Sequence, residues 1–307
     1  MNLPLLVNAS GCLDALAAPD VTRTLEAYVT KTITPEPREG NPPVRIAETG
    51  AGMLNSIGLA NPGRERFLGQ TLPRLRELGV PLWVSVGGFA ATEYAETCAA
   101  LDGRAGVAAI ELNLSCPNVN EAPESAAEIV LACRNATELP LYAKLSPATW
   151  DLAETARAVE AAGADGLSLV NTLRGLALDP VTLRPLLAAA TGGYSGPALK
   201  PVALAAVFAC ARAVRLPLVG MGGVSTGIDV LELIAAGAST VALGTVLFSD
   251  PAAPARIREE LATEVVRRGI KHPCDTLGFA HSSLQMGDSS LDNGLRKMPG
   301  NSVKATA

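Results

Sequence analysis

The chain has 307 residues, of which 48% are hydrophobic and 18% charged, and its formal net charge is -5. A chain this apolar can bury a large core, which excludes disorder over most of its length. The acidic balance and the lack of any Lys/Arg run argue against a nucleic-acid partner. No stretch has the pattern of a signal peptide or a membrane span, so we expect a cytoplasmic protein.

Cysteine and histidine usage limits the chemistry that the chain can perform. Six cysteines are scattered without a C-x-x-C pair, so neither a metal site nor a disulfide framework is predicted. The two histidines, His272 and His281, follow the last predicted strand. Proton transfer at a site among the strands therefore needs another residue type.

Short apolar runs that end in small or polar residues predict eight β-strands. The runs cover residues 5–10, 28–32, 82–87, 109–115, 141–146, 166–172, 218–223 and 241–245. Most are continuously apolar, as strands covered on both faces are. A helix is predicted after Asp151 as its N-cap, and it ends at Gly163. Gly79, Gly163 and Gly237 each stand between a helical pattern and a strand, where a positive φ is expected.

The repeated order of strand, helix and glycine predicts parallel strands. An open doubly wound sheet would give a similar pattern, but eight strands favour a closed (β/α)8 TIM barrel. We expect residues 1–280 to form this barrel and residues 281–307 to form a polar C-terminal tail.

The strand ends of a barrel line one mouth, where function is expected. Gly220-Met221-Gly222-Gly223 and Gly244-Thr245 end the last two runs and indicate a phosphate site, with two tight turns as the alternative. Lys31 and Lys144 lie inside apolar runs. Each needs an anionic partner unless its amine reaches solvent.

Cys116 lies in Asn113-Leu114-Ser115-Cys116-Pro117-Asn118, directly after the fourth run. A lone cysteine is often only a small core residue, but Pro117 cannot extend a strand, which favours a mouth loop for this thiol. The turn-rich segment at residues 55–59 is either a grip for a planar ligand or a plain surface turn.

Together, and in this order, the motifs resemble those of class 1 dihydroorotate dehydrogenases over about residues 5–275. The motifs that carry the resemblance are Asn8-Ala9-Ser10-Gly11, Val29-Thr30-Lys31-Thr32, Gly52-Met53-Leu54-Asn55-Ser56-Ile57-Gly58-Leu59, the Cys116 motif, Lys144-Leu145-Ser146-Pro147 and Asn171-Thr172-Leu173. Residues 191–201 and 220–223 are most similar to the class 1B branch, whose members use NAD through an electron-transfer subunit.

The resemblance implies FMN-dependent oxidation of (S)-dihydroorotate to orotate in pyrimidine biosynthesis. Cys116 would take the C5 proton while the C6 hydride passes to FMN. The residues implied to bind FMN are Ser10, Lys31, Thr32, Asn113, Lys144, Val170, Gly196, Gly222, Gly223, Gly244 and Thr245. Those implied to bind substrate are Lys31, Asn55, Ser56, Ile57, Gly58, Leu59, Asn113, Asn118, Asn171 and Thr172.

The resemblance also implies a homodimer and a partner subunit that carries FAD and an iron-sulfur cluster, since this sequence has no cluster ligand set. Three features depart from the family pattern. The chain begins almost at the first strand without a leading hairpin, the lid at residues 118–125 is short, and Ser85 stands where an asparagine beside the flavin is expected.

Other interpretations stay open at this stage. The dihydropyrimidine dehydrogenase flavin domain shares several of these motifs, and a short lid is compatible with an FMN-binding barrel without catalysis. A phosphosugar lyase with Lys144 as a Schiff base is a third alternative. The electron acceptor is also left open between NAD through a partner, fumarate and another compound.

Overall fold

The computed structural model describes residues 3–114, 126–149 and 151–282. Eight parallel strands form one sheet in the order β1-β12-β11-β8-β7-β6-β5-β2. Their bounds are β1 (Leu6–Asn8), β2 (Tyr28–Val29), β5 (Leu82–Val86), β6 (Val107–Asn113), β7 (Leu141–Leu145), β8 (Gly166–Leu169), β11 (Leu218–Met221) and β12 (Thr240–Leu243). Each of the eight predicted runs overlaps one of these strands, and β6 and β12 begin one or two residues before their predicted runs.

The seam between β1 and β2 decides whether the sheet is open or closed. Val7 forms a parallel bridge with Ala27 at this seam. At the next residue of β1, the fully buried side chain of Asn8, instead of its backbone, makes the hydrogen bonds to β2. Its Nδ2 donates to the Val29 carbonyl at 2.7 Å, and its Oδ1 accepts from the Val29 N–H at 2.9 Å. These contacts close the sheet, which confirms the TIM barrel over the open alternative.

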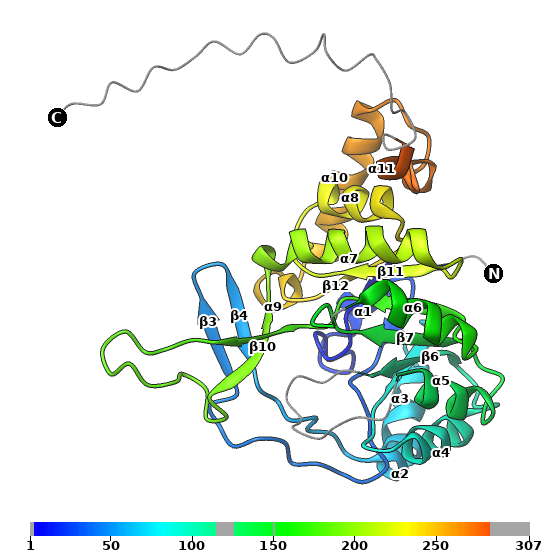
Figure 1. The fold of residues 1–307 in the computed structure, drawn as a ribbon, viewed down its shortest axis with the longest axis vertical. Coiled ribbons are helices and arrows are strands. Elements are labelled where there is room, and N and C mark those ends of the chain that lie inside the picture. The colour runs from blue at the N-terminus through cyan, green and yellow to red at the C-terminus, as the bar shows by residue number, and fades with distance from the viewer. Residues whose placement is uncertain (1–2, 115–125, 150, 283–307) are drawn as a thin grey trace.

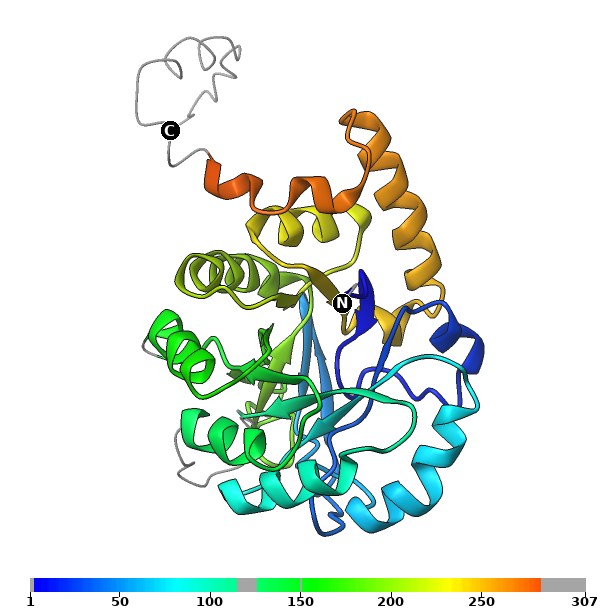
Figure 2. The ribbon, with the colours of Figure 1, turned by 90° about the vertical axis from the view of Figure 1, so that its right-hand side faces the viewer.

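Helices surround the strands (Figure 2). They are α1 (Pro19–Arg23), α2 (Arg64–Arg66), α3 (Leu72–Arg76), α4 (Ala91–Leu101), α5 (Ala126–Arg134), α6 (Leu152–Ala161), α7 (Lys200–Ala213), α8 (Gly227–Ala236), α9 (Val246–Ser249), α10 (Ala253–Arg267) and α11 (Phe279–Ser282), with short helical turns at Phe67–Thr71, Pro197–Leu199 and Pro273–Thr276. The main core lies between strands and helices and includes the fully buried Ile110, Leu141 and Leu167.

The interior of the barrel is packed with side chains. Trp83 of β5 and Tyr142 of β7 stack across it with ring centroids 4.4 Å apart. Gly166 of β8 makes room for this pair, because a Cβ there would lie 2.3 Å from Tyr142. As in other barrels, side chains fill the interior, and the site is expected beyond the strand ends.

A second sheet lies beside the barrel and was not predicted (Figure 1). It is antiparallel, in the order β3-β4-β10-β9. Its strands are β3 (Ile46–Thr49), β4 (Gly52–Asn55), β9 (Leu173–Leu176) and β10 (Thr191–Ser195). Because β9 begins just beyond the carboxyl end of β8, this sheet stands at the mouth of the barrel.

The predicted helix boundaries are confirmed. The Asp151 carboxylate accepts a hydrogen bond from the Glu154 N–H at 2.9 Å, so this residue caps α6. Gly79, Gly163 and Gly237 have φ values of 72°, 99° and 123°. Left-handed backbone of this kind carries little strain only at glycine.

We expect Asp151→Ala to lower the free energy of unfolding by about 1 kcal/mol, because the first turn of α6 loses its side-chain acceptor. Urea unfolding followed by circular dichroism measures the change. Asp151→Asn, which keeps an acceptor oxygen, should stay close to the parent protein. An alanine variant as stable as the parent would contradict the role of this cap.

His281 and Ser282, the first two residues of the predicted tail, belong to α11. His281, assigned to the tail from the sequence, packs on the body of the protein, with Nε2 2.9 Å from the Ala236 carbonyl and its ring stacked on Phe208 at 4.3 Å. The rest of the predicted tail, residues 283–307, lies outside the described residues. Among the helices of the described part, none is long and apolar enough to span a membrane.

Candidate functional site

A cavity of about 250 Å³ lies at the carboxyl ends of the barrel strands. The loops after β1, β2, β11 and β12 and the ends of β6, β7 and β8 supply one part of its wall. The antiparallel sheet supplies another part through Ile46, Met53, Asn55 and Ser195. The unpredicted sheet therefore completes the mouth of the barrel.

Most of the residues singled out from the sequence meet in this cavity. Ser10, Lys31, Thr32, Asn113, Lys144, Val170, Gly196, Gly222, Gly223, Gly244 and Thr245, all implied to bind FMN, line it. From the implied substrate set, Lys31, Asn55, Ile57, Leu59, Asn113, Asn171 and Thr172 line it. Cys116 and Asn118 lie outside the described residues. The roles of all these residues stay predictions.

Ser56 and Gly58 do not line the cavity, although the sequence placed them in the substrate set. Ser56 is 1% exposed, and its Oγ accepts from Asn41 Nδ2 at 2.7 Å. At Gly58, with φ of 71°, an added Cβ would lie 2.6 Å from the Asn41 backbone nitrogen. Both residues fix the path of the segment, while their neighbours Asn55, Ile57 and Leu59 face the cavity.

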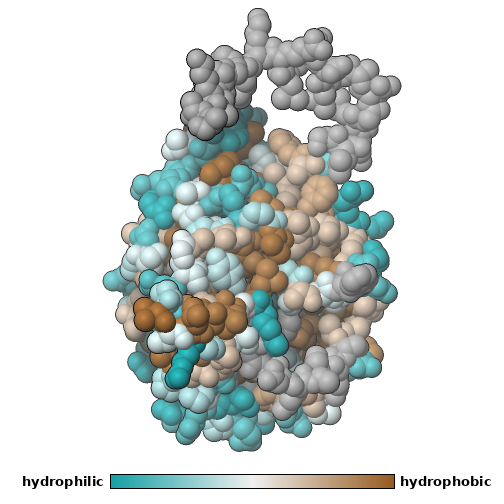
Figure 3. Space-filling model, turned by 60° about the vertical axis from the view of Figure 1, so that its left-hand side comes forward, coloured by the Kyte–Doolittle hydropathy of each residue, from teal (hydrophilic) through white to brown (hydrophobic). Residues whose placement is uncertain are grey.

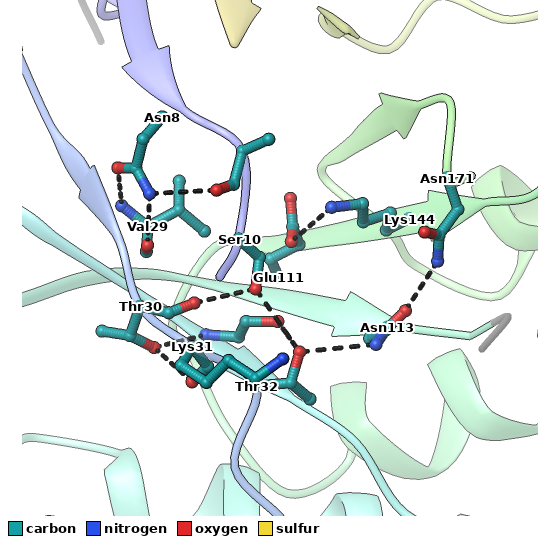
Figure 4. A network of polar contacts seen from close by, with 12 residues as sticks. Asn8, Ser10, Val29, Thr30, Lys31, Thr32, Glu111, Asn113, Lys144 and Asn171 are labelled. Atoms are coloured by element: carbon teal, nitrogen blue, oxygen red, sulfur yellow. Dashed lines mark hydrogen bonds and ion pairs between the residues drawn. The ribbon is translucent and has the colours of Figure 1, made fainter. Parts of the chain in front are cut away.

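A buried ion pair forms part of the site (Figure 4). Lys144 Nζ on β7 lies 3.4 Å from Glu111 Oε1 on β6, and the two side chains are 8% and 2% exposed. The sequence predicted an anionic partner for Lys144 but did not identify this carboxylate. Glu111 lies inside the apolar run 109–115, and a charged residue in such a run was the signal that could have identified it.

Polar side chains from neighbouring strands form a continuous network (Figure 4). Asn171 Nδ2 donates to Asn113 Oδ1 at 3.0 Å, and Asn113 Nδ2 donates to Thr32 Oγ1 at 3.4 Å. Thr32 Oγ1 also contacts Ser85 Oγ at 2.9 Å and Ser10 Oγ at 3.4 Å. Ser85 is fully buried and does not line the cavity, so it supports Thr32 at the place where a flavin contact was expected.

Lys31 adds a second cation to the wall of the cavity. Gly11, with φ of 78°, lies against its side chain, and a Cβ there would be 3.0 Å from Lys31 Cδ. The glycine thus makes room for the lysine. Because Glu111 balances the charge of Lys144, the charge of Lys31 is the one that favours a ligand with negative charge.

Cys12 is a lining residue that the sequence analysis did not single out. Burial raises the pKa of its thiol, and the nearby Lys144 and Lys31 offset only part of that rise. A thiol with a raised pKa stays protonated at neutral pH and is a poor base.

The loops after β11 and β12 contribute backbone N–H groups to the lining of the cavity. Gly222, Gly223, Val224, Gly244 and Thr245 all line it, and their N–H groups donate to no acceptor among the described residues. Gly222 and Gly223 have φ values of 124° and 75°, which only glycine adopts without strain. Clustered N–H donors of this kind bind anions such as phosphate.

Comparison with known proteins decides the family. The family model described as dihydroorotate dehydrogenase matches residues 3–265. The chain belongs to the dihydroorotate dehydrogenase family. It is 46% identical to the catalytic subunit of dihydroorotate dehydrogenase B (NAD(+)) from Trichlorobacter lovleyi, over 82% of this chain and 85% of that protein. The corresponding subunit from Geobacillus sp. is 44% identical, with 83% of each chain covered.

Two further members of the dihydroorotate dehydrogenase family extend the comparison. A Solibacter usitatus protein, provisionally named dihydroorotate dehydrogenase A (fumarate), is 45% identical over 83% of this chain and 86% of that protein. The crystal structure of DHODH from Eimeria tenella in complex with ferulenol superimposes with a TM-score of 0.72 at 23% identity, covering 90% of this chain and 85% of that chain. This likeness supports the barrel fold.

Proposed function

We propose that the chain oxidises dihydroorotate to orotate in pyrimidine biosynthesis, with FMN bound at the mouth of the barrel. One observation carries the proposal. Every described residue that the family motifs assign to the flavin lines a single cavity. This cavity holds two lysines and a glycine cradle, formed by Gly222, Gly223 and Gly244, whose N–H groups donate to no acceptor among the described residues.

The cavity suits FMN in two respects. The N–H groups after β11 and β12 would hold the phosphate, in the loops that commonly bind phosphate in this fold. Lys144 would stand beside the part of the ring that gains negative charge, where a buried cation is favourable. When bound, FMN supplies the acceptor for the hydride that leaves C6 of dihydroorotate.

The polar wall suits a pyrimidine that carries a carboxylate. Amide side chains at Asn55, Asn113 and Asn171 offer both donors and acceptors, which matches the alternating N–H and C=O groups of the ring. The Asn171–Asn113 hydrogen bond fixes the orientation of two of these amides in advance. Lys31 supplies a positive charge for the carboxylate of the substrate.

The proton at C5 requires a base. Among the described lining residues there is no Asp, Glu, His or Tyr, and Cys12 is held protonated by burial. Lys144 is committed to Glu111. The family resemblance implies that Cys116, three residues after Asn113 in the chain, takes the proton, and this inventory is consistent with that role.

The B-type relatives are named as catalytic subunits, which supports a separate partner for electron transfer. We infer that this partner carries FAD and an iron-sulfur cluster and passes electrons to NAD, and that two copies of this chain pair in the assembly. Hydrophobic side chains gather in places on the surface of the molecule (Figure 3). Leu176 at the end of β9 and Val181 and Leu183 after it are exposed, and they offer a surface for such contacts.

Substrate preference tests the proposed function. We expect dihydroorotate to give a kcat/KM at least about 100-fold above that of dihydrouracil with the same artificial acceptor, because dihydrouracil lacks the carboxylate. A preference for dihydrouracil would point to a dihydropyrimidine dehydrogenase. Turnover of neither compound by flavin-loaded protein would favour the non-catalytic barrel.

A further inference from the structure

A charged cluster lies directly behind the glycine cradle. Lys200 Nζ, at the start of α7, lies 2.6 Å from Asp229 Oδ1 and 2.8 Å from Glu232 Oε2 on α8. The Asp229 side chain is 7% exposed, whereas that of Glu232 is 40% exposed. None of the three residues lines the cavity, so their role is indirect.

Asp229 ties the cluster to the loop that follows β11. Its Oδ2 accepts from the Ser225 N–H at 2.8 Å, from Ser225 Oγ at 3.0 Å and from the Thr226 N–H at 2.8 Å. Thr226 in turn caps α8. The carboxylate therefore fixes the chain immediately after the lining residues Gly222, Gly223 and Val224.

The backbone of Lys200 lies against the same loop. A Cβ on Gly223 would lie 2.7 Å from the Lys200 backbone nitrogen and 2.9 Å from the Pro197 carbonyl. Gly196 and Leu199, just before Lys200, also line the cavity. The ion pair of Lys200 with Asp229 thus joins two segments, residues 196–199 and 222–224, that both contribute to the lining of the proposed flavin site.

We infer that Lys200 and Asp229 are positioning residues that hold the loop 222–224 in the shape required to bind the phosphate of the flavin. The inference rests on the proposed FMN site. Backbone N–H groups bind a phosphate well only when several of them converge on one point. A loop with two glycines is conformationally free and does not hold such an arrangement by itself. The ion pair and its hydrogen bonds supply that stiffness from outside the cavity.

The charges of the pair persist at neutral pH. Burial alone would raise the pKa of the Asp229 carboxyl, but hydrogen bonds from Lys200, Ser225 and Thr226 outweigh it and hold the pKa below its usual range. Hydrogen bonds to Asp229 and Glu232 raise the pKa of Lys200. The link between α7 and the loop is therefore an ion pair under the conditions in which flavin binds.

The test compares FMN with riboflavin, which has the same ring and no phosphate. Dissociation constants of both are measured on the full-length apoprotein by flavin fluorescence. We expect Lys200→Met to raise the Kd of FMN about tenfold, equivalent to ~1.4 kcal/mol, and to leave that of riboflavin within about twofold. Ser225→Ala, which removes one donor to Asp229 and keeps the ion pair, should raise the Kd of FMN by a smaller factor and serves if Lys200→Met does not fold.

Arg258→Met is the control, since it removes a cation about as exposed as Lys200 and breaks an ion pair with Glu26, 2.9 Å long, just before β2 at the opposite end of the barrel. It should change neither Kd. Equal weakening of FMN and riboflavin by Lys200→Met, or no change in either, would overturn the positioning role. A parent protein that binds FMN no better than riboflavin would overturn the proposed phosphate site itself.

Discussion

Replacement of Cys116 by alanine is expected to slow reduction of the bound flavin by dihydroorotate by about 10²–10⁴-fold, the usual contribution of a general base. Flavin content should not change, because the described lining residues implied to bind FMN are untouched. The described part of the cavity offers no carboxylate, imidazole or phenol as a substitute. Anaerobic stopped-flow measurement of the bleaching rate at a fixed, saturating substrate concentration gives the result.

Cys12→Ala is the matched control for this experiment, because it removes the thiol within the described part of the cavity. The thiol has a pKa raised by burial and should not act as a base. We expect the control to reduce its flavin within about threefold of the parent rate. Slow flavin reduction in the Cys12 variant, together with parent-like reduction in the Cys116 variant, would show that Cys12 and not Cys116 takes the proton.

Lys144→Met should lower the free energy of unfolding by about 3–5 kcal/mol, because it leaves the buried Glu111 carboxylate without a counter-charge. It should also lower the midpoint potential of the bound flavin, since the cation that favours the reduced ring is lost. Denaturant unfolding and redox titration of the holoprotein measure the two effects separately. A Lys144 variant that equals the parent in both would contradict the role of this pair.

The double variant Lys144→Met/Glu111→Gln separates stability from function. It removes both buried charges, so most of the lost stability should return. The flavin potential should stay low, because the cation is still absent. A double variant as unstable as Lys144→Met alone would show that the loss does not arise from an unpaired Glu111.

The barrel was predictable from the sequence because its strands are buried on both faces, which produces continuous apolar runs. The antiparallel sheet was not, because its strands lack that pattern. Ile46 is 49% exposed and Leu176 is 55% exposed. Gly192 and Gly193 in β10 also argue against a strand by composition. Tertiary packing explains the glycine at position 193, since a Cβ there would lie 2.1 Å from Thr172 Oγ1.

The site was predictable where one segment carries the signal and hidden where two distant segments meet. The glycine loops and Lys144 stand out in the sequence as strand-end residues. The pairing of Lys144 with Glu111 does not, because the two are 33 residues apart and meet only through the alignment of β6 with β7. Asp229 was equally hidden, since its contacts with Lys200 depend on the packing of α7 against α8.

The central claim is that dihydroorotate delivers its electrons to FMN at the mouth of this barrel. The visible spectrum of the purified protein, recorded before and after anaerobic addition of dihydroorotate, tests it most directly. Our account predicts the absorption of bound flavin at the outset and the loss of that absorption once each flavin has oxidised one molecule of dihydroorotate. A colourless protein that takes up no FMN, or a yellow one whose spectrum dihydroorotate leaves unchanged, would contradict it.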